Sequence, residues 1–406
     1  MIENCLPVPY KGSETGKWVH FSIVERLPAI IERIISENEY DQEIESQLKR
    51  LRDDIPYGLI RPLNDSQYAG KDNWDEYITS YQGMNWLDIP WFFAELYFYR
   101  RVLEATKYFL QDENERIDPY QLQKNQGLIN AKQQIQNLFN HIAILKDELK
   151  GENDILKYCL KFALWGNQAD LSLWPVSNDE KNGATSFLQF DRQIIIDESD
   201  ELLLYINSNR GNIRRMDIIL DNVGIELVSD LNLANYLLTE EIVDRIYMHV
   251  KRYPLFVSDA MGNDVMETVE TLSKDTNQLI SDFGQRLQGY LREGHLKLKD
   301  HPFWVSPLPL WKLPESLSND LMESQLIIVK GDANFRRILG DLHWCRESTF
   351  TSFDKYLPAS LVALRVLKSE IIVGIKNNRE LELWEIDPDW MINGRWGIIQ
   401  FAERRK

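Results

Sequence analysis

The sequence predicts an α/β protein in which a mostly parallel sheet follows a helical N-terminal part. Up to about residue 155, apolar residues recur with helical spacing and little of the chain has the composition of a strand. From about residue 156, short runs rich in leucine or β-branched residues alternate with amphipathic stretches. That alternation is typical of βαβ units. We therefore predict a helical domain over 1–155 and an α/β domain over 156–406.

Four stretches of the N-terminal part have helical periodicity: 18–38, 41–54, 88–110 and 122–149. The third is apolar on nearly every side, so we predict a buried helix with Asp88 as N-cap and Pro90 in the first turn. The alternative is that Glu95 or Arg100 of this helix lines a cleft.

Five short apolar runs of the α/β part are predicted strands: 194–196, 216–220, 255–257, 326–329 and 362–367. Helices are predicted between them, including 224–247 and 266–292. In the first of these two, Leu227, Leu231 and Leu238 recur at helical spacing.

The composition excludes several classes of protein. The 406 residues are 44% hydrophobic, which is typical of an ordinary globular protein, and the net charge of −17 disfavours binding to a nucleic-acid backbone. No basic segment precedes an apolar run at the N-terminus and no long apolar stretch follows, so we expect neither export nor a membrane span. Three cysteines without metal-ligand spacing favour a reducing cytoplasm. The sequence does not indicate the oligomeric state.

Three predicted strands run into acidic or amide residues: 216–222, 254–259 and 326–332. The carboxyl ends of parallel strands meet at one edge of a sheet, so Asp221, Asn222, Asp259 and Asp332 should converge there. Oxygen ligands gathered in this way would repel one another without a hard cation such as Mg²⁺ or Mn²⁺ between them. No close pair of histidines supports a zinc site. We predict an oxygen-ligated metal site.

Two further segments support a site at this edge. In 221–226 a strand passes into a helix, Gly224 permits a tight turn and Glu226 lies in the first helical turn, although a simple N-cap is the alternative. In 330–337 the free amides of a helix N-terminus and the bidentate donor Arg336 predict a phosphate or carboxylate cradle, against the alternative of a solvated basic turn.

Two other positions are less specific. Lys368 follows an apolar run and could neutralise a phosphoryl oxygen, although lysines at strand ends are usually surface residues. Asn167 and Asp170 could add polar contacts, but loop capping explains them equally well. A divalent cation with Arg and Lys around a small anion suits phosphoryl hydrolysis, in which catalysis is positioning and charge neutralisation.

The order of these segments resembles the metal-dependent damage-control phosphatases, also called acidic-residue methyltransferase-like or protein-glutamate O-methyltransferase-like proteins. The likeness extends over most of the chain. It includes Trp91–Arg101, Leu164–Ser172, Asp221–Glu226, Phe256–Asp259, Lys330–Arg336 and Asn393–Phe401.

The resemblance implies an α/β/α sandwich with a helical N-terminal domain, and phosphorylated sugars such as fructose 1-phosphate or fructose 6-phosphate as substrates. It implies Mn²⁺, Ni²⁺, Co²⁺ or Mg²⁺ bound by Asp221, Asn222 and Asp259. The substrate contacts that it implies are Glu226, Asp332, Asn334, Arg336 and Lys368.

The chain departs from the family at one position. The branch that it resembles most has an Arg-Thr-x-Lys signature near the C-terminus, and here the run is Arg365-Val-Leu-Lys368, without the threonine hydroxyl. This departure bears on substrate choice more than on metal binding.

The catalytic hypothesis is that Asp259 or Asp332 orients or deprotonates a metal-activated water, while Arg336 and Lys368 offset phosphoryl charge. An aspartyl-phosphate intermediate is the alternative.

Two other functions compete with the phosphatase hypothesis. An S-adenosylmethionine-dependent carboxyl methyltransferase usually needs a glycine-rich turn, and the turn at Gly224 has one glycine where that motif has three. A non-hydrolytic sugar-phosphate sensor, or a specialised pathway enzyme, would use the same site differently.

Overall fold

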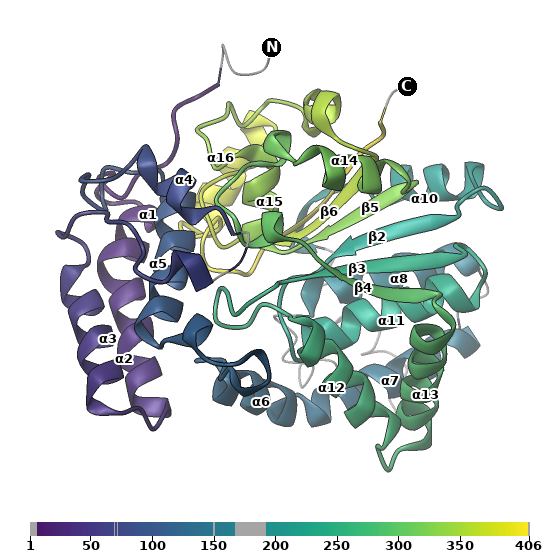
Figure 1. The fold of residues 1–406 in the computed structure, drawn as a ribbon. Helices are drawn as coiled ribbons and strands as arrows, with labels where there is room; N and C mark the ends of the chain where they lie inside the picture. Colours follow the sequence, from purple (N-terminus) through teal and green to yellow (C-terminus); the bar gives the residue numbers. More distant parts are fainter. Residues whose placement is uncertain (1–5, 69, 71, 149–150, 167–191, 405–406) are drawn as a thin grey trace.

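The computed structural model describes residues 6–68, 70, 72–148, 151–166 and 192–404, and Figure 1 shows its central sheet with helices on both faces. In these residues the strands form one sheet in the order β1-β7-β6-β5-β2-β3-β4. Strands β6, β5, β2, β3 and β4 are parallel, β7 is antiparallel to β6, and β1 is parallel to β7. The strand bounds are β1 Ile194–Asp197, β2 Arg215–Ile219, β3 Arg245–Val250, β4 Leu296–Asp300, β5 Leu326–Lys330, β6 Ser360–Val366 and β7 Gly397–Ala402.

Of the helices of the N-terminal part, α1 to α5 stand beyond one end of the sheet, at the left of Figure 1, and α6 lies at the bottom of the view. They are α1 Trp18–Phe21, α2 Leu27–Glu37, α3 Gln42–Asp54, α4 Trp74–Thr79, α5 Trp91–Ala105 and α6 Gln121–Asn130. A π-helical turn, η2 (Ser22–Arg26), joins α1 to α2. The predicted helix over 18–38 is therefore one continuous element, because α1, η2 and α2 follow one another without a break.

The remaining helices are α7 Lys132–Glu148, α8 Glu152–Trp165, α10 Ser199–Ser208, α11 Ile225–Thr239, α12 Gly262–Ser273, α13 Gln278–Glu293, α14 Glu315–Met322, α15 Asp332–Leu339 and α16 Asn377–Ile386. Short 3₁₀ turns occur at Ser66–Tyr68, Tyr108–Leu110, Glu113–Glu115, Pro302–Val305, Leu310–Lys312 and Phe350–Tyr356.

The sheet separates two hydrophobic cores. Successive side chains of a strand point to opposite faces, and accordingly Ile218 belongs to a core with α8, α11 and α13, whereas Ile219 belongs to a core with α5 and α15. Both faces are covered, so the central strands β2 and β5 are buried along their whole length. The three-layer α/β/α architecture with a helical N-terminal part is confirmed.

Helix α5 is buried at all of its residues, as predicted, but its start was predicted wrongly. Pro90 is the N-cap and has extended backbone, and Asp88 lies in the preceding turn. The reason is tertiary: residue 90 pairs with Lys11 in an isolated bridge, and the Trp91 amide donates to the Tyr10 carbonyl at 2.8 Å.

The predicted strand at 255–257 is also wrong. This segment forms a turn, and the strand of that region is β3, which ends at Val250. β3 carries Arg, Tyr and His among its apolar residues, which hides it in the sequence. Strands β4 and β7 were not predicted, and the predicted helices over 122–149 and 266–292 are each divided in two.

The predicted domain boundary at 155/156 falls inside α8, and the core on the α15 face of the sheet includes residues of α2, α3 and α5. The division into two domains stays a prediction.

Among the described residues, no helix combines the length and apolar character of a membrane span. Of the cysteines in the described ranges, Cys159 is buried and Cys345 is exposed.

Candidate functional site

A cavity of about 280 Å³ lies where the strand order reverses. From β2 the sheet continues to β3 and β4, and from β5 it continues to β6, so the loops after β2 and β5 diverge. Such a switch point is where open α/β sheets bind ligands. The cavity is lined by Trp18, Arg26, Trp91, Glu95, Asp221, Asn222, Phe256, Ser258, Asp259, Asp332, Ala333, Arg336 and Lys368.

The four oxygen-bearing residues predicted to converge all line this cavity. Backbone pairing holds two of the segments together: Asn222 and Asp259 form an antiparallel bridge, and the Ala260 amide donates to the Asp221 carbonyl at 2.8 Å. Asn222 Nδ2 donates to Asp221 Oδ2 at 2.8 Å, and Ser258 Oγ donates to Asn222 Oδ1 at 2.5 Å. The amide oxygen of Asn222 therefore keeps a lone pair for a ligand.

The turn before Asp259 has unfavourable backbone angles. Phe256 and Val257 have φ of 48° and 69°, in the left-handed region that a β-branched residue rarely adopts. Such residues persist only where surrounding structure imposes them, and they cluster at functional sites. Here the turn brings Ser258 and Asp259 to the wall of the cavity.

The carboxylates of Asp221 and Asp259 are in an environment that disfavours two negative charges. Burial raises the pKa of Asp221 well above its ordinary value, and Glu226 and Asp259 raise it further. Burial also raises the pKa of Asp259, although the ammonium of Lys251, 3.1 Å away, acts in the opposite direction. A bound cation would relieve this repulsion.

The donor set fits a hard divalent cation. Among the described residues, no three His, Cys, Asp or Glu side chains group as a metal site. The set at the cavity instead combines two carboxylates with one amide oxygen, from Asp221, Asp259 and Asn222. Oxygen donors of this kind suit Mg²⁺ or Mn²⁺.

Asp332 begins α15 and is held by one of its two oxygens. Oδ1 accepts from Arg365 at 2.8 Å, from the Lys368 amide at 3.2 Å and from Ser369 Oγ at 3.0 Å. Burial would raise the pKa of Asp332, but the guanidinium groups of Arg365 and Arg336 outweigh it and hold the pKa below its usual value. Asp332 is thus an ionised acceptor at neutral pH.

Arg336 is buried and donates to two carboxylates. Its Nε and Nη2 donate to Asp341 at 2.9 and 3.0 Å, and its Nη1 donates to Glu95 at 2.6 Å. The guanidinium lies 3.6 Å above the Trp91 ring. Glu95 also lines the cavity, in agreement with the alternative interpretation of α5. Arg100, the other residue of that interpretation, does not line the cavity and is paired with Asp65 and Asp72.

Two predicted substrate contacts, Glu226 and Asn334, lie behind the cavity wall. Glu226 Oε2 accepts from Asn222 Nδ2 at 3.0 Å, and the Asn334 amide donates to the carbonyls of Leu220 and Lys330. Both are almost completely buried and neither lines the cavity. Glu226 lies one side chain behind Asn222, whereas Asn334 holds the backbone of Leu220, the residue before Asp221.

Lys368 is exposed and lines the cavity, so this predicted contact is where it was expected. Val366, which replaces the signature threonine, is buried in the core with α8 and α11 and does not line the cavity. Asn167 and Asp170, for which polar contacts and loop capping were equally good interpretations, lie outside the described residues, as does the end of the Leu164–Ser172 segment.

Several lining residues were not predicted: Trp18, Arg26, Trp91, Phe256 and Ser258. Trp18 and Arg26 come from the N-terminal helix, far from the strand ends on which the prediction was based. Trp91 and Phe256 lie in apolar runs, where nothing in the sequence separates a lining aromatic from a core one.

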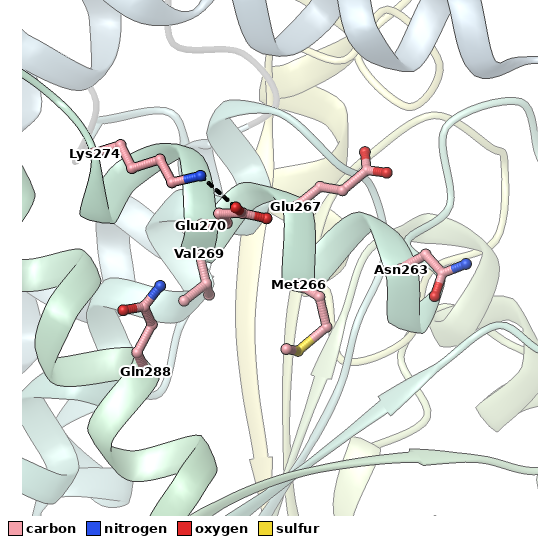
Figure 2. Close-up of a pocket in the computed structure, with 7 residues that line it drawn as sticks. All are labelled: Asn263, Met266, Glu267, Val269, Glu270, Lys274 and Gln288. Atoms are coloured by element: carbon pink, nitrogen blue, oxygen red, sulfur yellow. Dashed lines mark hydrogen bonds and ion pairs between the residues drawn. The ribbon is translucent and has the colours of Figure 1, made fainter.

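Another hollow, of about 320 Å³, lies between α12 and α13. Figure 2 shows its side chains spread along the two helices, with Lys274 paired to Glu270. Binding sites usually carry convergent polar groups, and this hollow has none of the carboxylates described above. The cavity at the switch point is the candidate site.

Comparisons with known proteins identify the family to which the chain belongs. The damage-control phosphatase ARMT1-like domain matches residues 22–383. The chain is 30% identical to damage-control phosphatase ARMT1 of Danio rerio, over 95% of each chain, and 28% identical to that of Xenopus laevis, over 98% and 99%. The chain is also similar to a crystal structure of a DUF89 family protein from Pyrococcus horikoshii. The match covers 95% of this chain and 98% of that one, with 17% identity and a TM-score of 0.49, and we draw no functional conclusion from it.

The match to the family therefore extends across both the helical part and the sheet, and it includes nearly every segment that lines the cavity. The chain belongs to the damage-control phosphatase ARMT1-like family and is a phosphatase.

Proposed function

We propose that this protein is a divalent-metal-dependent phosphatase that hydrolyses sugar phosphates such as fructose 1-phosphate or fructose 6-phosphate. The observation that carries the proposal is the convergence of Asp221, Asn222 and Asp259 on one cavity wall, with Lys368 on the same cavity. The family relation supports the reaction class. Two buried carboxylates with raised pKa values and a nearby cationic side chain suit a metal together with a phosphate group.

Asp221, Asn222 and Asp259 would hold the cation, which is Mn²⁺, Ni²⁺, Co²⁺ or Mg²⁺ in this proposal. A cation bound there would supply Lewis-acid charge and lower the pKa of an attacking water. Asn222 is oriented for this role by Ser258 and Glu226, which fix both ends of its amide. Second-sphere contacts of this kind tune ligand orientation.

Asp332 is the better candidate of the two proposed catalytic carboxylates. Its Oδ1 takes hydrogen bonds from Arg365, Lys368 and Ser369, while Oδ2 makes none among the described residues and is free to accept one from a water. Asp259 is instead paired with Lys251 and assigned to the metal. Asp332 would orient the water, and its low pKa keeps it ionised to do so.

The remaining lining residues suit a small phosphorylated molecule. The cavity has a volume of about 280 Å³, with Trp18, Trp91 and Phe256 among its lining residues beside the carboxylates. Aromatic side chains offer apolar faces to the carbon skeleton of a sugar, while carboxylates accept its hydroxyl groups. Glu226 and Asn334 act in this proposal by positioning Asn222 and the Leu220 backbone.

The test is phosphate release from a panel of sugar phosphates, with each of the four metals and with EDTA. We expect release that requires metal and that Asp221→Ala abolishes while the fold is retained. Turnover that persists in EDTA or in Asp221→Ala would contradict the metal role. Bound metal without any phosphate release would favour the non-hydrolytic sugar-phosphate protein, and tight metal-independent binding of S-adenosylmethionine would favour the methyltransferase.

A further inference from the structure

We propose that Arg26, on the N-terminal helix, binds the phosphoryl group of the substrate together with Lys368. The proposal rests on the proposed function, because it adds a residue to the same phosphate site. Arg26 lines the cavity and belongs to η2, so the helical N-terminal part would take part directly in substrate binding.

The hydrogen bonds of the two cavity arginines differ. Arg336 donates to carboxylates through all three of its nitrogens, so its orientation is set within the protein. Arg26 donates only through Nη1 among the described residues, to Glu95 at 2.8 Å and to Ser22 Oγ at 3.4 Å. Its further polar neighbour is the Tyr99 hydroxyl. Even with that hydroxyl accepting one hydrogen bond, two of the three N–H groups on Nε and Nη2 remain for a bound anion.

The exposure and the charge environment of Arg26 also support binding of an anion. The Arg26 side chain is 34% exposed and the Arg336 side chain 3%, so Arg26 is the more accessible of the two arginines that line the cavity. Glu95 lies between them, with Oε1 on Arg26 and Oε2 on Arg336, and it divides its single negative charge between two guanidinium groups. Arg26 is therefore incompletely neutralised, and a phosphate oxygen would complete its coordination.

The position of Arg26 is also suitable. Tyr99, its neighbour, packs its ring 5.1 Å from the ring of Phe256, in the turn that carries Asp259. The Asp259 carboxylate is close enough to contribute to the raised pKa of Tyr99. Arg26 thus approaches the metal carboxylates from the N-terminal side of a cavity of about 280 Å³. A guanidinium at that place is the fork-shaped donor that best matches phosphate oxygens.

The test is calorimetric binding of inorganic phosphate to the full-length protein in MnCl₂, which needs no turnover. We expect Arg26→Gln to raise the Kd for phosphate about 10- to 100-fold, the loss typical of charge-assisted hydrogen bonds. Arg26→Lys keeps the charge and can keep the Glu95 pair, so it should lose only the bidentate share, about 3- to 10-fold. Arg33→Gln is the control, because Arg33 is on the adjoining helix and its exposed side chain pairs with Glu37.

Thermal melting of each variant shows whether it is folded. If Arg26→Gln does not fold, the phosphate affinity of Arg26→Lys provides the test instead. Wild-type affinity for phosphate in the folded Arg26 variants would overturn the proposal. So would a wild-type protein that binds no phosphate, or weaker binding of sugar phosphates with unchanged binding of inorganic phosphate. Failure of the proposed function is distinguishable: wild type would then release no phosphate from any ester, while the calorimetric loss in Arg26→Gln would persist.

Discussion

The backbone of Gly331 packs directly against the carboxylate of Asp221. A Cβ at position 331 would lie 1.9 Å from Asp221 Oδ2, closer than a non-bonded carbon and oxygen can approach. Gly331 also has a φ of 84° at the point where β5 passes into α15. Glycine is therefore required at this position for two reasons: the turn needs a positive φ, and the side chain of Asp221, the proposed metal ligand, occupies the space of a Cβ.

We predict that Gly331→Ala abolishes metal binding and phosphatase activity, because Asp221 must move away from Asn222 and Asp259. Metal titration followed by calorimetry measures the loss. Gly211→Ala is the matched control. Gly211 has a φ of 80°, and a Cβ added to it would meet no atom within 4 Å, so this variant introduces backbone strain without a steric clash. That control should lose about 1 kcal/mol of stability and no metal affinity. Equal metal affinity in both variants would contradict the prediction.

A second prediction separates the two catalytic carboxylates. Asp332→Asn should lower kcat about 10²- to 10³-fold, because the water loses an ionised acceptor, while the affinity for metal changes little. Asp259→Asn should lose metal affinity itself. Steady-state kinetics together with metal titration distinguish the two, and a large loss of metal affinity in Asp332→Asn would refute this division of roles.

A third prediction concerns the buried ammonium of Lys330, for which the sequence offers no independent functional support. Its Nζ lies 3.3 Å from Glu226 and 3.2 Å from Asp230, and it donates to the Ala163 carbonyl. Lys330→Met leaves both carboxylates without their cationic partner and should cost about 3–5 kcal/mol in the free energy of unfolding. Urea denaturation measures this cost.

The cost should fall markedly in the double variant with Asp230→Asn. Burial raises the pKa of Asp230 to about 7, against the lowering effect of Lys330. An additive double variant would mean that Lys330 and Asp230 do not interact, contrary to the 3.2 Å contact.

A fourth prediction concerns stability against pH. Burial opposes ionisation of Asp320, but hydrogen bonds from Arg215 and Lys299 lower its pKa to about 2 from the ordinary value of 3.8. A depressed acid pKa stabilises the fold above the unfolded-state value, and that contribution disappears as the pH falls from 3.8 toward about 2. Asp320→Asn should cost about 1 kcal/mol at pH 7 after discounting for solvent screening.

Urea denaturation of wild type and Asp320→Asn at pH 7, 5 and 3 tests this prediction, and the difference between them should shrink at pH 3. Asp244→Asn is the control, since Asp244 pairs with Arg214 in a largely exposed contact. A difference for Asp320→Asn that is constant across the three pH values would contradict the assigned pKa.

The candidate site was largely predictable because its ligands follow the strands in the chain. Asp221 and Asn222 follow β2 after one intervening residue, and Asp332 follows β5 after one intervening residue. Asp259 was placed correctly for a wrong reason, since the run before it is a turn with left-handed residues and not a strand. Short apolar runs do not separate a strand from a buried turn without the partner strands.

The sequence by itself determined the layered α/β class, the buried helix α5 and the set of oxygen donors at the strand ends. These follow from local periodicity and from the rule that parallel strands end at one edge. Only the tertiary structure decided that Glu95 bridges Arg26 to Arg336, and that Val366 faces the core and not the cavity. The physical reason is that these relations are contacts between elements distant in sequence, whose distances are set by packing and not by any local pattern.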